Sequence, residues 1–146
     1  MKRLTYSALL LFLAAACGTG AKHQRPSQNV RSDAYALVFS ASRAAQPGIV
    51  LQIFSDSITT VLDSVVLHGI DETYSMWQKL ATNAMLTTTN RTILSTETFG
   101  DTALRDRGRI VFSRTAMKDT TMTFSSMWHR EKAGWRIVVD SVRAGR

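Results

Sequence analysis

The sequence predicts an α+β fold in which three N-terminal helices pack on one face of a curved antiparallel sheet. Apolar residues recur at helical spacing in the first half of the domain, whereas from Met85 onward Val, Ile, Thr and aromatic residues form strand-like runs. Gly100, Gly108, Lys118-Asp119 and Gly134 punctuate these runs, which predicts four long strands in a meander. Helices followed by a meander of strands are typical of the α+β class.

The closing hairpin, residues 121–143, predicts the register most directly. Two runs rich in Val, Ile, Thr, Phe and Trp flank a polar turn at 131–134 that ends in glycine. Pairing Arg130 with Trp135 and alternating from there separates two faces. The predicted core face consists of Phe124, Ser126, Trp128, Trp135, Ile137 and Val139, with Ser141 continuing it. The opposite face carries Thr123, Ser125, Met127, His129, Arg136, Val138 and Asp140.

The helical half begins with an apolar stripe over residues 30–45, for which Ser32 is the predicted N-cap. Pro47 starts a short second helix over 47–54, since proline is favoured in the first helical turn. Residues 55–57 break this run before a strand at 58–62.

Residues 65–67 form a second short strand that pairs with 58–62 as a hairpin. His68 and Gly69 then open a third helix, whose buried stripe includes Ile70, Tyr74 and Trp77. In the meander that follows, Gly108 lies within a strand-like run and predicts a bulge that bends the sheet around the helices.

The first thirty residues predict export and lipid anchoring. Lys2 and Arg3 precede an apolar run over 4–16 that is too short to span a bilayer comfortably. Residues 13–18, LAAACG, resemble the lipobox of bacterial lipoproteins, in which the cysteine, here Cys17, is lipidated after cleavage. The alternatives are an ordinary signal peptide cut near Ala16 and an uncleaved anchor.

We therefore divide the chain into a signal peptide (1–16), a lipidated cysteine with a flexible tether (17–29) and one domain (30–146). A single cysteine cannot form an internal disulfide, and lipidation would account for it. Resemblance to the sorting pattern, with Gly18 after the cysteine, implies the periplasmic face of the outer membrane.

Composition excludes several functions. The formal charge is +7, of which Lys2 and Arg3 contribute two, and the other basic residues are scattered among apolar ones. That pattern favours a solvated sheet face over a nucleic-acid groove. The sequence contains no glycine-rich phosphate loop, and its three histidines and one cysteine are not spaced as metal ligands. We expect no metal, cofactor or nucleic-acid partner.

Several short motifs resemble the nuclear transport factor 2-like (NTF2-like, SnoaL-like) superfamily, and its DUF4440 branch in particular. They are FSDS at 54–57, HGID at 68–71, GDTA at 100–103, MWHR at 127–130 and GWRIV at 134–138. The resemblance implies a cone-shaped fold with a pocket between the concave sheet and the helices. It also implies dimerisation through the sheet in many members.

Enzymes of this superfamily, such as ketosteroid isomerase, scytalone dehydratase and polyketide cyclases, carry an Asp or His base on the concave face. Relatives of the DUF4440 branch often place a histidine there, where this chain has Val139 and Ser141. Alternation places Asp140 on the opposite face. The remaining catalytic candidates are Asp56, Asp63 and His68, each of which has an alternative role as a turn, cap or helix-entry residue.

The pocket predicted from the resemblance has an apolar and aromatic wall with a few polar groups. Its candidate lining residues are Tyr35, Trp77, Ser126, Trp128, Trp135, Val139 and Ser141. We expect a lipid-anchored protein that binds a small apolar molecule or an envelope protein without catalysis. The alternatives are a small isomerase, dehydratase or cyclase, and a module that forms homodimers or docks through the outer face of its sheet.

Overall fold

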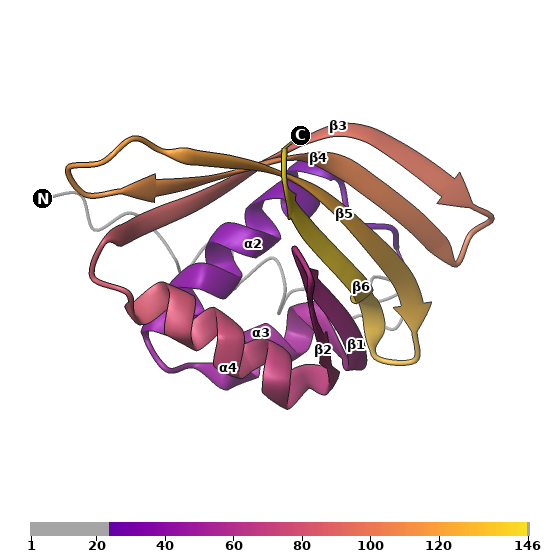
Figure 1. The fold of residues 1–146 in the computed structure, drawn as a ribbon. Coiled ribbons are helices and arrows are strands. Elements are labelled where there is room, and N and C mark those ends of the chain that lie inside the picture. Colours follow the sequence, from indigo (N-terminus) through magenta and orange to yellow (C-terminus); the bar gives the residue numbers. More distant parts are fainter. Residues whose placement is uncertain (1–23, 146) are drawn as a thin grey trace, which may run out of the picture.

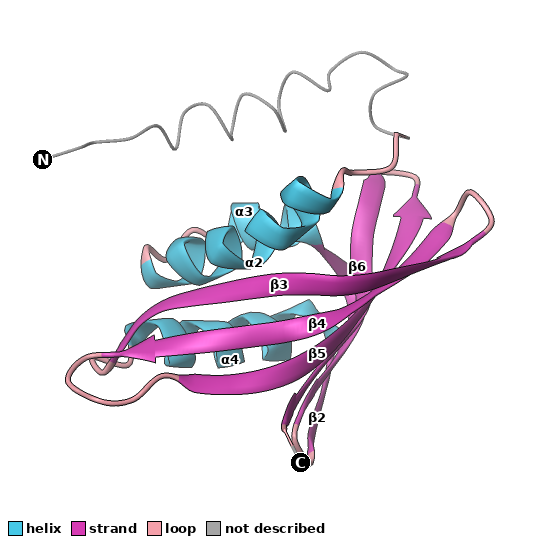
Figure 2. Cartoon of the chain, turned by 90° about the horizontal axis from the view of Figure 1, so that it is seen from above, coloured by secondary structure: helices cyan, strands magenta, loops and turns pink. Residues whose placement is uncertain are grey.

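The computed structural model describes residues 24–145, so the predicted signal peptide and Cys17 lie outside the described residues. Three helices cover one face of a six-stranded, strongly bent sheet (Figures 1 and 2). No helix within residues 24–145 is long and apolar enough to cross a bilayer. The elements in order are α2 (Gln28–Arg43), α3 (Pro47–Ile53), β1 (Phe54–Leu62), β2 (Val65–His68), α4 (Gly69–Thr82), β3 (Leu86–Phe99), β4 (Ala103–Arg114), β5 (Thr120–Glu131) and β6 (Gly134–Ala144).

The strand order is β2-β1-β6-β5-β4-β3, which confirms the predicted α+β cone and its four-strand meander. The sheet is mixed rather than wholly antiparallel, because β1 runs parallel to β6. A parallel pair requires a long connection, and here α4 and the whole meander separate the two strands in sequence. The prediction considered only strands adjacent along the chain and so missed this pairing.

Helix boundaries differ from the prediction at two points. Ser27, not Ser32, caps α2, and its side chain accepts a hydrogen bond from the Val30 amide. Ser32 lies inside the helix and donates to the Arg91 carbonyl in β3. Residues 55–57 belong to β1 rather than breaking the run between α3 and the strand.

The predicted distortion near Gly108 is present, but the extra residue lies in β3. Ile93 pairs with Gly108 and Ser95 with Arg107, so Leu94 bulges out of the ladder. A Cβ on Gly108 would collide with the Thr92 carbonyl and the Phe124 ring. Glycine therefore allows the two backbones to approach where the sheet bends.

A second bulge, in β6, corrects the predicted register. Trp128 pairs with Ile137 as expected, but Met127 pairs with Val139, so Val138 is the extra residue. Beyond this point each side chain faces opposite to the prediction, because sheet faces alternate with a period of two. Val139 is 41% exposed on the outer face, whereas Asp140 is 1% exposed on the inner face.

The two tryptophans of the closing hairpin face the helices, as predicted. Trp128 is 4% exposed and Trp135 is 9% exposed. Tyr35, from α2, packs its ring against Phe54 and Trp77, with centroid distances of 6.2 and 6.4 Å. These contacts join the two longer helices to the concave side of the sheet.

Candidate functional site

A row of polar residues crosses the inner face of the sheet. Thr96 in β3, Asp106 in β4, Ser126 in β5 and Asp140 in β6 are successive cross-strand partners. Thr60 extends the row into β1, where it pairs with Asp140. All but Thr96 are at most 2% exposed. Buried polar groups need partners, and the helices and β3 supply them.

Asp140 accepts hydrogen bonds from three different side chains. Arg91 donates through both terminal nitrogens, at 3.0 Å to Oδ1 and 2.9 Å to Oδ2. Tyr35 and Ser126 each donate to Oδ1 at 2.8 Å. The Arg91 and Asp140 side chains are 0% and 1% exposed, so this ion pair is isolated from solvent.

Asp106 forms a second buried ion pair at the other end of the row. The Nε of Arg31 lies 2.6 Å from Oδ2, and its Nη2 donates to Oδ1 at 3.0 Å. Thr96 donates to the same Oδ1 at 2.6 Å. Arg31 and Tyr35 are four residues apart on α2 and so share one helix face, which places both over the polar row.

The space above the row is occupied by side chains. The Arg91 guanidinium carbon lies 3.0 Å from the centroid of the Tyr35 ring and 4.5 Å from that of Phe124. Five buried polar side-chain atoms lack a hydrogen-bond partner among residues 24–145, namely Arg91 Nε, the indole nitrogens of Trp77 and Trp128, and the hydroxyls of Ser42 and Thr89. No cluster of metal-binding side chains exists in this part of the chain.

The residues predicted to line one pocket are divided between two faces. Five of them, Tyr35, Trp77, Ser126, Trp128 and Trp135, are buried inside the cone. Val139 and Ser141 instead line a hollow on the outer face, because of the β6 bulge. The structure therefore does not bring the seven together.

The three predicted catalytic candidates are all exposed. Asp56 lies in β1, and Asp63 accepts a hydrogen bond from the Ala144 amide in the turn after β1. His68 is the residue before α4, and its amide donates to the Glu72 carboxylate. Asp63 and His68 occupy the turn and helix-entry positions that were their alternative interpretations, whereas Asp56 lies within a strand and not at the expected turn or cap. None of the three joins the polar row.

Sequence reasoning missed Arg31, Arg91 and Asp106. Arg91 and Asp106 occupy inward positions of otherwise alternating strands, between Thr89 and Ile93 and between Leu104 and Gly108. A charge on an apolar stripe was the available signal, because such a residue must be paired once the stripe is buried.

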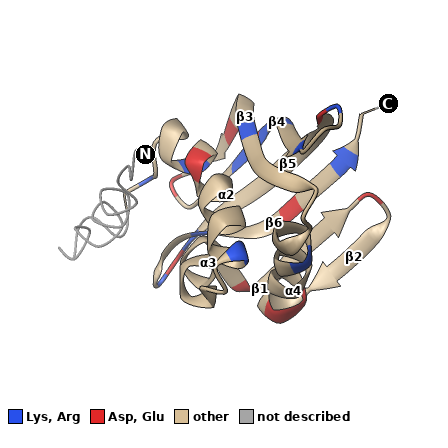
Figure 3. Ribbon diagram, turned by 90° about the vertical axis from the view of Figure 1, so that its left-hand side faces the viewer, with Lys and Arg blue, Asp and Glu red and all other residues tan. Residues whose placement is uncertain are grey.

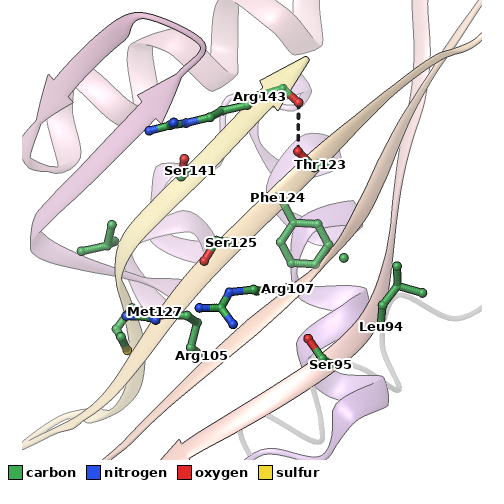
Figure 4. Close-up of a pocket in the computed structure, with 12 residues that line it drawn as sticks. Leu94, Ser95, Arg105, Arg107, Thr123, Phe124, Ser125, Met127, Ser141 and Arg143 are labelled. Carbon is green, nitrogen blue, oxygen red and sulfur yellow. Dashed lines mark hydrogen bonds between the residues drawn. The ribbon is translucent and has the colours of Figure 1, made fainter. Parts of the chain in front are cut away.

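A hollow among the described residues lies on the sheet face away from the helices. Its volume is about 690 Å³, and it extends across β3, β4, β5 and β6. Figure 4 shows Arg107 and Ser125 near its centre, with Leu94 and Ser95 on one side and Ser141 and Arg143 on the other. We call this hollow the outer groove. A smaller one, about 390 Å³, lies where α4 runs into β3.

The outer groove is strongly basic. Arg105 and Arg107 from β4 and Arg143 from β6 line it. Arg109 points outward on the same strand, which is marked by blue segments in Figure 3, but it is not part of the lining. Glu97 is the one carboxylate within 4 Å of these arginines in the described part of the chain, at 3.7 Å from both Arg105 and Arg107.

The Tyr35 hydroxyl provides a pH-dependent test of the buried network. Burial raises the pKa of Tyr35 well above its ordinary value of 10.0. Tyr35→Phe should lower the free energy of unfolding by about 1–3 kcal/mol at neutral pH, since buried hydrogen bonds are lost. Above about pH 10 the unfolded tyrosine ionises while the folded one keeps its proton, so the wild type loses stability that the variant never had.

The difference in free energy of unfolding between the wild type and Tyr35→Phe should therefore become smaller as pH rises through about 10. Urea unfolding of both proteins over a series of pH values measures it. A gap that stays constant or widens would contradict a buried, neutral Tyr35.

Comparison by sequence matches no family model and no curated protein. By structure the chain is similar to an NTF2-like protein of unknown function from Shewanella oneidensis, with 17% identity, TM-score 0.63 and coverage of 76% of this chain and 93% of that chain. An NTF2-like superfamily protein from Salmonella enterica gives 14% identity, TM-score 0.60 and coverage of 81% and 90%. An NTF2-like protein from Cytophaga hutchinsonii gives 10% identity, TM-score 0.63 and coverage of 83% of this chain and 100% of that chain. These likenesses, with the bent six-stranded sheet and its helical layer, show that the chain has the NTF2-like fold.

Proposed function

We propose that this protein is a non-enzymatic binding module, anchored in the cell envelope through Cys17, that engages another protein through the outer groove. The observation that carries the proposal is the contrast between the two faces of the sheet. On the inner face, Asp106 and Asp140 are both paired with arginines and buried. On the outer face a hollow of about 690 Å³ is open to a partner.

Catalysis by Asp140 is disfavoured by its surroundings. A general base must come within hydrogen-bond distance of the proton that it removes. Asp140 already accepts hydrogen bonds from Arg91, Tyr35 and Ser126, and it is 1% exposed. The rings of Tyr35 and Phe124 both pack against the guanidinium of Arg91. These contacts leave the carboxylate no free approach.

An isomerase, dehydratase or cyclase is the second candidate function. One observation favours it: Asp140 lies on the inner wall, which is where the enzymes of the superfamily carry their base. Buried indole donors without acceptors, at Trp77 and Trp128, likewise favour a small molecule inside the cone. Catalysis at Asp140 and binding of a small molecule inside the cone would each require Arg91 and Tyr35 to move first, because these side chains occupy the space next to Asp140.

The finer family assignment is part of the same proposal. The MWHR and GWRIV segments at 127–130 and 134–138 support the DUF4440 branch. The LAAACG segment at 13–18 supports export and lipid anchoring, although it lies outside the described residues.

Lipid anchoring predicts that Cys17→Ser removes membrane attachment. The variant should stay unprocessed or be released, because it lacks the thiol that would carry the lipid. Membrane fractionation and intact mass of the full chain, expressed in its own cells, measure this. Equal fractionation and an unshifted mass relative to wild type would contradict the anchor.

Engagement through the outer groove predicts site-specific cross-linking. A photo-reactive amino acid at Ser125, in the groove, should form an adduct with another protein in intact cells. The same substitution at Ser75, an exposed residue of α4, serves as the matched control and should form none. Adducts at neither site, or equally at both, would contradict the proposal. Turnover of a steroid ketone that Asp140→Asn abolishes would favour the enzyme instead.

A further inference from the structure

We infer that the outer groove binds an extended acidic segment of a partner protein, with Asp or Glu at alternate positions. This inference rests on the proposed function and names the chemistry of the partner. Its first support is the spacing of the arginines. Arg105, Arg107 and Arg109 point outward at every second residue of β4. Side chains so placed repeat about every 6.8 Å, which is also the repeat of alternate side chains in an extended peptide.

The groove already holds one carboxylate of its own chain. Glu97, in β3, places Oε2 at 3.7 Å from a guanidinium nitrogen of Arg105 and of Arg107. A carboxylate therefore fits between these two side chains. At that distance the contacts are loose ion pairs on partly exposed residues, which contribute little stability. An incoming carboxylate with better geometry would displace Glu97 at small cost.

Neighbouring groups suit a peptide rather than a bare anion. The row beyond Arg107 places Ser125 and Ser141 side by side across β5 and β6, where their hydroxyls are available as donors. Leu94 and Val139 flank them and are 62% and 41% exposed. These apolar side chains can pack against the uncharged residues of a segment whose alternate positions are acidic.

Arg109 and Arg143 lie on either side of Thr123 in the next row. Neither has an ion-pair partner within residues 24–145, and the Thr123 hydroxyl donates to the Arg143 carbonyl. The basic surface thus continues past the pair that Glu97 partly neutralises.

A second copy of the chain is a poorer occupant, although dimerisation through this face is what the family resemblance implies. A two-fold contact places the same patch on both sides, so the basic surface that holds Arg105, Arg107 and Arg143 would face an equally basic surface. Like charges directly opposed destabilise a contact. Residues 1–23 contain no Asp or Glu, so that segment of the chain does not supply the carboxylates either.

A single-stranded nucleic acid is also disfavoured. Binding of that kind combines a basic groove with exposed aromatic rings on which bases stack. Phe124 is the aromatic residue in the lining of the groove, and it is 4% exposed.

Fluorescence anisotropy with a labelled peptide tests the inference. The probe is a ten-residue peptide of alternating Glu and Ser, and the controls are the corresponding Lys and Ser peptide and a ten-nucleotide oligothymidine. The full chain is used, solubilised in non-ionic detergent. We expect the acidic peptide to bind, with affinity falling at least about tenfold when the salt concentration rises from about 50 to 300 mM. The basic peptide should not bind.

Charge variants then locate the site. Arg107→Gln should weaken binding about fivefold, while Arg114→Gln, on the same strand but outside the groove, should leave it within about twofold. Glu97→Gln should strengthen binding, because it removes the internal competitor. Asp33→Asn, an equal change of charge on the exposed side of α2, should have a smaller effect.

Circular dichroism checks that each variant is folded. Equal effects of the groove variants and their controls would overturn the inference, as would oligothymidine binding as tightly as the acidic peptide. Concentration-dependent dimerisation that Arg107→Gln strengthens would assign the face to a second copy instead. If the peptide fails to bind while Ser125 still cross-links in cells, the acidic chemistry is wrong and the binding-module proposal stands. If the peptide does not bind and Ser125 does not cross-link, the acidic-segment inference and the binding-module proposal are both wrong.

Discussion

The buried ion pair between Arg91 and Asp140 is the interaction on which the rest of the structure depends. Two charges removed from water are tolerated only when each is fully paired and hydrogen-bonded. Both terminal nitrogens of Arg91, the Tyr35 hydroxyl and Ser126 all converge on the Asp140 carboxylate. The pair therefore links α2, β3, β5 and β6, and none of these elements can move independently without exposing a charge to an apolar interior.

The two faces of the sheet carry different polar groups, and β4 shows the contrast. Inward positions of β4 carry Leu104, Asp106 and Gly108, while the outward positions between them carry Arg105 and Arg107. The inner carboxylates, Asp106 and Asp140, form hydrogen bonds with Arg31 and Tyr35 of α2 and so connect the helical layer to the sheet. The outward arginines remain on the surface and form a basic groove. Among the described residues, the side chains of Tyr35, Arg91 and Phe124 pack together over the inner polar row, and the hollow of about 690 Å³ lies on the opposite face.

The fold could be predicted from the sequence because its signals are local. The closing turn before Trp135, the proline at the start of α3 and Gly108 at the bend each specify their own surroundings. The arrangement of the candidate site could not be predicted, because it depends on which residue of β6 forms the bulge. Val138 and Val139 are both suitable strand residues, and nothing in the sequence indicates which of them bulges. That choice decides whether Asp140 faces solvent or the helices, and with it the chemistry of the interior.

A double-mutant cycle on Arg91 and Asp140 tests the central claim, that an ion pair fills the cone as a structural element. Arg91→Met and Asp140→Asn each leave a buried group without its partner. In urea unfolding, each should lower the free energy of unfolding by about 3–5 kcal/mol, with strong coupling between them. Losses below about 1 kcal/mol with no coupling, as for an exposed pair, would contradict the account.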